Sequence, residues 1–322
     1  DSPSQVWHLK ISGVIGPASS DLLIRTLEEA RDNNAHLLIV QLDTPGGLDS
    51  SMRDMIQAVI DSPVPVATFV HPKGARAASA GTYLLYASHV AAMSPATNLG
   101  AATPVQIGMP NQPTRPGEKE QQQPTAQSAM QKKIINDAVA YIRGLAALHG
   151  RNADWAEQAV REGVSLDSGQ AVEQSVVDLV ALDVNDLLQQ LDGQPVVKSG
   201  ASEPEALGAG VFRLLPYQLQ QLEPDWRHQF LSVITDPSIA YILLMIGMYG
   251  LIFEFYNPGL GGPGILGAIC LLVALYALQM LPINYAGLAL IILGVALMVA
   301  EAMSPSFGIL GTGGLASFVI GS

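Results

Sequence analysis

One serine lies among very small side chains in the segment ARAASAGT, residues 75–82. It follows an apolar run typical of a buried strand and precedes a helical pattern. The start of a helix stabilises negative charge through its dipole and free N–H groups, and small neighbours leave room for a substrate carbonyl. Ser79 is therefore a candidate nucleophile, with the Ala80 N–H beside it. A helix N-cap serine is the structural alternative.

A glycine pair follows another buried strand in the segment DTPGG, residues 43–47. Glycines allow the backbone to turn sharply and leave N–H groups that no side chain covers. Such N–H groups can stabilise the oxyanion that develops during acyl transfer. Gly46 and Gly47 are therefore candidate oxyanion donors, and an ordinary turn is the alternative.

A nucleophilic serine needs a proton acceptor, and the lysines fit this role better than the histidines. The histidines fall on strand patterns, at helix ends or near the apolar C-terminal part, and none has metal-ligand spacing; they are His8, His36, His71, His89, His149 and His228. Lys132 and Lys133 precede a strong helical pattern at 134–149. A lysine that burial keeps neutral near pH 7 can act as a general base. A solvated lysine in the first helical turn is the alternative.

The elements that must position these residues alternate along the chain. Strand patterns at 6–11, 37–42, 64–70 and 90–93 are separated by helical patterns at 20–33, 50–60 and 82–88. This alternation predicts βαβ units and a mainly parallel sheet. Residues 103–127 are rich in proline and polar side chains and are predicted to form a flexible flap.

The C-terminal part has the composition of a membrane domain. Residues 239–322 contain no Lys, Arg or Asp, and their only charged side chains are Glu254 and Glu301. Apolar runs at 239–255, 265–281 and 286–302 approach the roughly 17–20 residues that cross a bilayer, and a fourth begins near residue 307. We therefore expect an all-α transmembrane domain with about four spans. The connections between the runs carry no basic residues, so charge does not orient them.

Each of the two glutamates opens a similar segment, EFYNPGLGGPGILG and EAMSPSFGILG, which predicts two helical hairpins in tandem. We interpret the glutamates as residues at helix ends, and proton transfer is the functional alternative. The formal charge of −12 becomes −10 for residues 1–238 without these two acids. A negative polar part argues against nucleic acid or an anionic lipid surface as its main partner. No cofactor or metal motif is present.

Five segments together resemble the NfeD family of membrane-bound, ClpP-class serine proteases. In the polar part they are LLIVQLDTPGGL, GARAASAGTYLLYASHVAAMSPATNLGAATPV and KIINDAVAYIRGLAALHGRN; in the apolar part they are SVITDPSIAYILLMIGMYGLIFEFYNPG and EAMSPSFGILGTGGLASFVIGS. The resemblance implies an α/β, ClpP/crotonase-like domain at 1–194, a linker and juxtamembrane segment at 195–238, and the transmembrane domain at 239–322. Long members carry a C-terminal OB-fold domain, which this sequence does not contain, so a shortened or partly covered long form is implied.

By the same resemblance, Ser79 is the nucleophile, Lys133 the general base, and Gly46, Gly47 and Ala80 the oxyanion donors. The implied activity is cleavage of hydrophobic peptide segments by a Ser-Lys dyad, without a cofactor, in a homo-oligomer of at least two chains. The implied substrate or partner is a stomatin-type (SPFH) membrane protein. The implied location is multi-pass in the inner (plasma) membrane, with the protease domain outside the cytoplasm. The alternatives are a non-proteolytic scaffold for a stomatin-like oligomer and a crotonase-type acyl-CoA enzyme, which the membrane part and the nucleophile-type serine disfavour.

Overall fold

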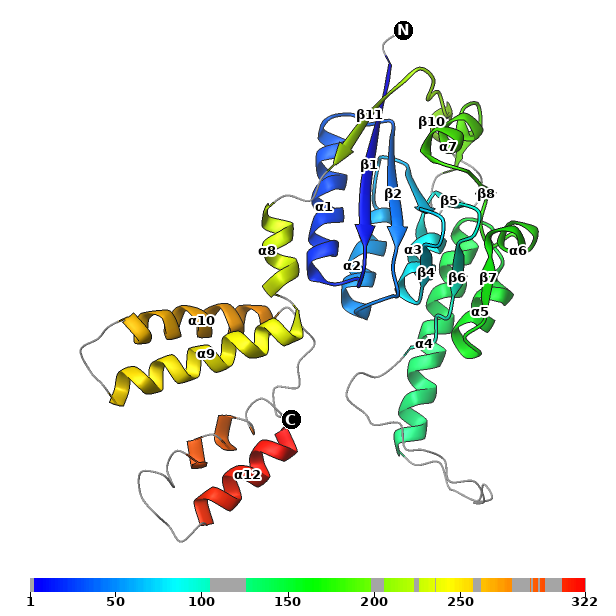
Figure 1. Ribbon diagram of the computed structural model, residues 1–322. Helices are drawn as coiled ribbons and strands as arrows, with labels where there is room; N and C mark the ends of the chain where they lie inside the picture. The colour runs from blue at the N-terminus through cyan, green and yellow to red at the C-terminus, as the bar shows by residue number, and fades with distance from the viewer. Residues whose placement is uncertain are drawn as a thin grey trace, which may run out of the picture. The chain divides into compact units, whose positions relative to one another are not determined.

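The computed structural model describes residues 3–104, 126–197, 206–222, 226–234, 236–256, 262–279, 290, 292–294, 296–298 and 309–321 (Figure 1). The chain divides into two compact units, Asp1–Gln229 and Phe230–Ser322.

The first unit is built on a six-stranded sheet in the order β11-β1-β2-β3-β5-β8, in which every pair of neighbours is parallel. The strands are β1 (Ser4–Ser12), β2 (Leu37–Asp43), β3 (Val66–Val70), β5 (Val90–Met93), β8 (Leu179–Val180) and β11 (Tyr217–Leu222). The central strands read as continuous apolar runs because parallel sheets are covered on both faces. The prediction of an α/β fold on a parallel sheet is confirmed.

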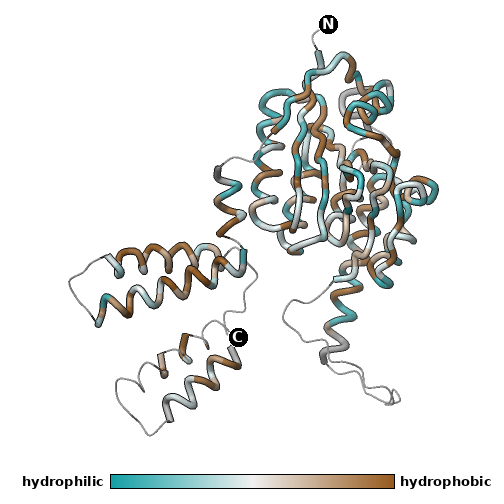
Figure 2. The backbone as a smooth tube through the Cα atoms, viewed as in Figure 1, coloured by the Kyte–Doolittle hydropathy of each residue, from teal (hydrophilic) through white to brown (hydrophobic). Residues whose placement is uncertain are grey.

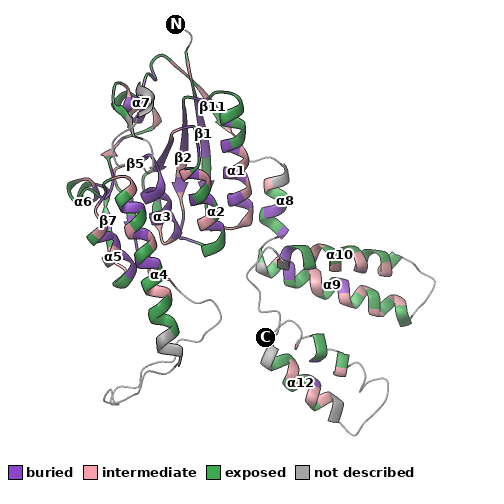
Figure 3. Ribbon diagram, turned by 180° about the vertical axis from the view of Figure 1, so that it is seen from behind, coloured by how far each residue is buried: buried purple, intermediate pink, exposed green. Residues whose placement is uncertain are grey.

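Two hydrophobic clusters lie on the two faces of this sheet. The larger contains side chains of α1 (Pro17–Asp32), α2 (Asp49–Ile60), α3 (Ala80–Ala87), α4 (Ala126–Leu148) and α5 (Ala153–Arg161), and the smaller contains side chains of α7 (Val184–Leu191). Along β2, Leu38, Val40 and Leu42 face the larger cluster while Leu37 and Ile39 face the smaller. This is the alternation of a strand whose successive side chains point to opposite faces. Figure 3 shows the buried strands between the surrounding helices.

Short strands and one short helix complete the first unit. Strands β4 (Arg76–Ala78), β6 (Asn98–Gly100) and β7 (Ser165–Asp167) form a three-stranded sheet beside Ser79, α6 (Ser168–Glu173) follows β7, and β9 (Pro195–Val197) pairs antiparallel with β10 (Ala206–Val211). Within the predicted linker and juxtamembrane segment at 195–238, the described residues 195–197 and 206–222 contain strands β9, β10 and β11. Strand β11 lies beside β1, with Ser4 opposite Tyr217, because Tyr217 and Leu219 pack against the smaller cluster while the alternating glutamines face solvent.

One helix boundary matters for the site. The helix predicted to begin at residue 134 begins at Ala126, so Lys132 and Lys133 lie inside α4 rather than in front of it. Residues 105–125 of the predicted flap lie outside the described residues.

The second unit contains apolar helices, which stand out in the hydropathy colouring of Figure 2. Helix α8 (Trp226–Ile234) crosses the division between the units, and α9 (Pro237–Tyr256), α10 (Gly262–Gln279) and α12 (Ile309–Gly321) follow. Within the described residues, one helix, 238–256, is long and apolar enough to cross a membrane, and the apolar helix 262–277 is shorter. The multi-pass arrangement with about four spans remains a prediction.

Glycines allow close backbone approach within this unit. A methyl group on Gly247 of α9 would come within 2.7 Å of the Leu271 nitrogen of α10, and one on Gly294 would come within 2.6 Å of the Gly314 oxygen of α12. Small residues commonly mediate such contacts between membrane helices. Both contacts agree with the two hairpins expected from the sequence repeat.

The first of the two repeat glutamates lies at a helix end. Glu254 Oε2 accepts a hydrogen bond from the Gly264 N–H at the start of α10, over 3.4 Å. A carboxylate at this position is stabilised by the positive end of the helix dipole. The contact favours the structural interpretation of Glu254, whereas Glu301 lies outside the described residues.

Candidate active site

Ser79 occupies a strained turn between β4 and α3. Its backbone has φ 52° and ψ −116°, a conformation that residues other than glycine rarely adopt. The Ser79 N–H donates to the Gly100 carbonyl of β6 over 3.0 Å. Ser79 stands at the N-cap position of α3, but its side chain makes no capping hydrogen bond. The hydroxyl is therefore presented by the turn and is not consumed by the helix end, which removes the N-cap alternative.

The glycine turn after β2 lies directly against this serine. A methyl group on Gly46 would come within 2.6 Å of the Ser79 Cβ and 3.1 Å of its Oγ. Only glycine is comfortable there, because Gly46 also has φ 112°. The structure thus brings together Ser79 and the glycine pair, which are more than thirty residues apart in the chain.

The three predicted oxyanion donors differ in availability. The Gly46 N–H is buried and donates to Thr44 Oγ1 over 3.0 Å. Gly47 is exposed, and its N–H has no acceptor within the described part of the chain. The Ala80 N–H, at the first position of α3, has no acceptor inside the helix. The N–H groups of Gly47 and Ala80 therefore have no acceptor within the described residues, while Gly46 supplies the close approach to Ser79.

Two buried threonines that sequence reasoning missed hold this turn in place. Thr44 receives the Gly46 N–H, and its backbone pairs with Arg76 and Ala78 of β4 over 2.7 and 3.1 Å. Thr82 Oγ1 donates to the Ala77 carbonyl over 2.9 Å and accepts from the Gly100 N–H over 3.1 Å. In the sequence, the signal that could have identified these threonines is a hydroxyl within an apolar segment. A buried hydroxyl there requires hydrogen-bond partners.

Both candidate lysines lie on α4 with exposed side chains, but they lie on different faces of the helix. Asp137 and Tyr141 follow Lys133 by one and two turns, which places all three on one side of the helix. Asp137 bonds to Arg53 of α2 over 2.8 Å, and Tyr141 stacks on Tyr83 of α3 at 6.1 Å.

Lys132 precedes Asn136 by one turn, and Asn136 accepts a hydrogen bond from Arg161 of α5. Helical periodicity therefore places Lys133 on the side of α4 that faces α2 and α3, and Lys132 on the side that faces α5.

Histidines do not contact Ser79 within the described residues, and two of them lie at the opposite end of its helix. His89 Nδ1 accepts from the Val66 N–H over 3.2 Å, and His149 Nε2 lies 3.1 Å from the Ala87 carbonyl. The two rings are 5.9 Å apart. Both rings therefore bond to backbone groups away from the Ser79 end of α3.

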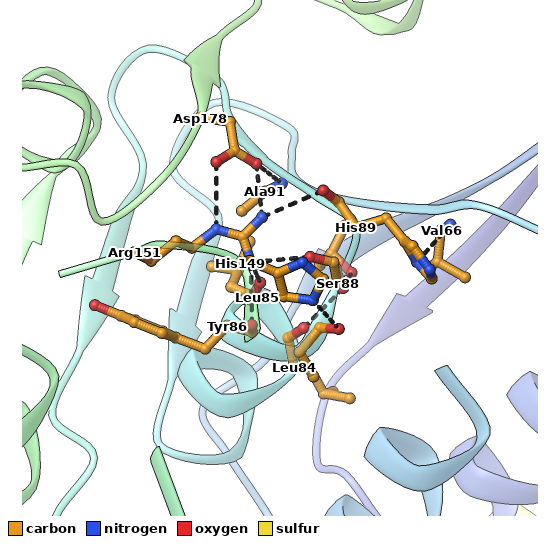
Figure 4. A network of polar contacts seen from close by, with 12 residues as sticks. Val66, Leu84, Leu85, Tyr86, Ser88, His89, Ala91, His149, Arg151 and Asp178 are labelled. Carbon is orange, nitrogen blue, oxygen red and sulfur yellow. Dashed lines mark hydrogen bonds and ion pairs between the residues drawn. The ribbon is translucent and has the colours of Figure 1, made fainter. Parts of the chain in front are cut away.

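A buried arginine closes the same end of α3 (Figure 4). Arg151, with 2% of its side chain exposed, forms a 2.6 Å ion pair with Asp178. Its Nη1 donates to three carbonyls at the end of the helix, over 2.8 to 3.1 Å, those of Leu85, Tyr86 and Ser88. A cation at a helix C-terminus satisfies orphan carbonyls and complements the dipole. Arg151 therefore anchors the helix that presents Ser79.

This network makes folding stability dependent on pH. Burial lowers the pKa of His89 to about 4, and the neighbouring His149 and Arg151 act in the same direction. Burial likewise lowers the pKa of His149 to about 4, with a further contribution from Arg151. The unfolded chain, with histidine pKa values near 6.5, binds more protons between these limits. Stability should thus be full above about pH 6.5 and decline towards pH 4, by about 1.4 kcal/mol per pH unit for each histidine.

Thermal unfolding of the detergent-solubilised protein between pH 8 and 4.5 measures this effect. Trp155 is the fluorescent reporter, because it stacks on Tyr86 beside the network at 6.4 Å. His149→Gln is expected to flatten the pH dependence, although the lowered pKa values of His89, His8 and His71 retain part of it. Equal slopes for His149→Gln and the parent would contradict this assignment.

Comparison with known proteins gives two family matches that together cover most of the chain. Residues 5–195 match the N-terminal domain of NfeD1b, and residues 238–322 match the NfeD integral membrane domain. The chain is 35% identical to the membrane-bound protease PH1510 of Pyrococcus horikoshii over 319 residues, which are 98% of this chain and 68% of that protein. It is 29% identical to the membrane protein NfeD1b of Bacillus subtilis, over 98% of this chain and 65% of that protein.

Solved structures of 1510-N, a membrane protease from Pyrococcus horikoshii, match between 70% and 73% of this chain. A lysine-to-alanine variant of this stomatin-specific protease with a bound substrate peptide gives a TM-score of 0.61 at 32% identity, covering 73% of this chain and 99% of that one. A serine-to-alanine variant gives 0.57 at 31% identity, covering 70% of this chain and all of that one. This homology supports a protease function. With the two family matches, it shows that the chain belongs to the NfeD family of membrane proteins.

Proposed function

We propose that this chain is a membrane-anchored serine endopeptidase in which Ser79 is the nucleophile and Lys133 the general base. The observation that carries the proposal is the strained turn at Ser79, whose hydroxyl is free of any capping role and lies against Gly46. The N–H groups of Gly47, next to Gly46, and of Ala80, next to Ser79, have no acceptor within the described residues. Strain of this kind is retained where the surrounding structure over-determines it, and it concentrates at active sites.

In the proposed reaction, the neutral Lys133 amine takes the Ser79 proton as Oγ attacks a peptide carbonyl carbon. The carbonyl oxygen becomes an oxyanion that accepts hydrogen bonds from the Gly47 and Ala80 N–H groups. Collapse of the tetrahedral intermediate breaks the C–N bond, and the lysine gives its proton to the leaving amine. Water, deprotonated by the same lysine, then hydrolyses the acyl-enzyme and regenerates Ser79.

Assignment of the base to Lys133 is supported by the face of α4 on which it lies. Lys133 shares that face with Asp137 and Tyr141, which contact α2 and α3, whereas Lys132 points towards α5. Lys133 is exposed on the single chain, and a basic lysine must lose its hydration to be neutral. The proposal therefore includes a homo-oligomer of at least two chains, in which a second copy or the substrate covers the amine.

The proposed substrate is a hydrophobic segment of a stomatin-type membrane protein. Support comes from the related protease, which is described as specific for a stomatin homologue, and from the membrane domain matched at residues 238–322. We propose a multi-pass arrangement in the plasma membrane with the first unit outside the cytoplasm. Proteolysis of intact against opened cells tests that orientation, because an external unit is digested in both.

A fluorophosphonate probe tests the proposed chemistry directly. It reacts with an activated serine, so the parent should be labelled, and labelling should be lost in Ser79→Ala and strongly reduced in Lys133→Ala. Lys132→Ala is the matched control, because it removes an adjacent exposed lysine from the other face of α4. An unlabelled parent that still co-purifies with a stomatin-type protein would instead support the scaffold.

A further inference from the structure

Arg53 lies on α2 and connects the start of α2 to α4, the helix that carries the proposed base Lys133. Its Nε donates to Asp49 Oδ2 and its Nη2 donates to Asp137 Oδ2 of α4, each over 2.8 Å. The guanidinium carbon lies 4.5 Å from the centre of the Tyr141 ring, a cation–π contact. One side chain therefore holds α4 through a charge-assisted bond and an aromatic contact at the same time.

This guanidinium lies next to the elements that carry the site. Asp49 opens α2 two residues after Gly47. Tyr141 stacks on Tyr83, which lies one helical turn after Ser79 in α3. The Arg53 contacts thus relate the glycine turn, the nucleophile helix and α4 to one another.

Arg53 also affects the charge next to Lys133, because Asp137 follows Lys133 by four residues on α4. A lysine and an aspartate four residues apart on a helix are neighbours that attract each other. Here the Asp137 carboxylate bonds to Arg53, and Lys133 forms no ion pair within the described residues. A free carboxylate beside a lysine would favour its ammonium form, which cannot accept a proton. Occupation of Asp137 by Arg53 removes that competition.

Resting on the proposed Ser79–Lys133 dyad, we propose that Arg53 is a positioning residue for the general base. It fixes α4 against the start of α2 and withholds the Asp137 carboxylate from Lys133. The proposal assigns Arg53 no contact with substrate.

Other charged or titratable groups near this face do not substitute for Asp137. Loss of Arg53 would also free Asp49, which lies at the start of α2, whereas Asp137 lies one helical turn from Lys133 on the same helix. Burial raises the pKa of Tyr83 on α3, and burial likewise raises that of Tyr141 on α4, so both phenols stay neutral at working pH. Arg161 and Glu157 of α5 pair with each other, on the side of α4 that carries Lys132 and Asn136. Among the described residues, Asp137 is therefore the carboxylate that loss of Arg53 would release towards Lys133.

The test is the pH dependence of peptide cleavage by the full chain reconstituted in lipid vesicles. A lysine base gives a rate that rises with pH as the amine becomes neutral. Arg53→Gln is expected to shift this rising limb upward by about 0.4 pH unit, with about a twofold loss of kcat near neutral pH. The double variant Arg53→Gln/Asp137→Asn should return the limb to its parental position, because the released carboxylate is gone. Arg53→Lys keeps the positive charge but lacks the forked guanidinium, so it should shift the rising limb less than Arg53→Gln does.

Arg143→Gln is the matched control. Arg143 also lies in an exposed ion-pair cluster involving α4, with 41% of its side chain exposed against 39% for Arg53, but it pairs with Asp154 and Glu157 of α5, away from the proposed site. Its pH profile should match the parent. A loss of rate in Arg53→Gln without a shift of the limb, or a shift that the double variant leaves in place, would overturn the proposal. If Lys133→Ala cleaved peptide at the parental rate, the Ser79–Lys133 dyad itself would be refuted. This outcome distinguishes failure of the dyad from failure of the Arg53 proposal.

Discussion

Alanine in place of Ser79 is expected to lower kcat for peptide cleavage by about 10⁶. Ser79 Oγ is the atom that forms the acyl bond in the proposed reaction, and the residual rate would come from the N–H groups and from substrate binding. Lys133→Ala should cost a similar factor, because a hydroxyl without a base attacks poorly. The double variant should be no slower than the single variants, since a nucleophile and its base act as a unit. Single-turnover cleavage of an apolar peptide by reconstituted protein measures all three.

Lys132→Ala separates this result from a general effect of charge removal on α4. It should cleave within a factor of a few of the parent, because Lys132 lies on the α5 side of the helix with Asn136. If Lys132→Ala were inactive and Lys133→Ala remained active, the general base would be Lys132 and the assignment to Lys133 would be wrong. A double variant much slower than either single variant would mean that Ser79 and Lys133 contribute independently.

Gly47→Ala is expected to reduce kcat by about 10²–10³, the usual cost of losing an oxyanion donor. The added methyl group would lie 2.0 Å from the Ile15 carbonyl oxygen and 2.6 Å from the Ile15 carbonyl carbon and nitrogen. These are backbone atoms that cannot rotate away, so the turn must move. Ile15 braces that turn from both sides, because its N–H donates to the Gly46 carbonyl and its carbonyl accepts the Leu48 N–H, each over 2.9 Å.

Gly16→Ala is the control for Gly47→Ala. A methyl group on Gly16 meets nothing within 4 Å, and its φ of −152° suits any residue. It should keep parental kcat, whereas Gly47→Ala should lose rate while its thermal unfolding still shows a folded first unit. A folded Gly47→Ala variant whose kcat stays within tenfold of the parent would show that this N–H does not stabilise the oxyanion.

Local patterns in the sequence were enough to identify the fold class and to place a small-residue turn at Ser79, which we propose as the nucleophile. Strands 37–42, 64–70 and 90–93 read as apolar runs because both faces of a parallel sheet are covered, and all three were observed within two residues. Ser79 and the Gly46-Gly47 pair were identifiable because small residues after buried strands are unusual unless the backbone needs the space. These signals span fewer than ten residues each.

Contacts between distant segments determined the rest. The Gly46 N–H is taken by Thr44, Lys133 rather than Lys132 faces α2, and β11 pairs with a strand more than two hundred residues away. Arg53 and Arg151 read as ordinary surface charges until α4 and α3 bring their partners to them. Short-range periodicity reports which face of an element is buried, but not which element covers it. By itself, the sequence determined the strands, the helices and the reactive turn. Tertiary structure alone decided which N–H groups stay free and which lysine lies on the α2 side of α4, because such contacts depend on the relative placement of whole elements.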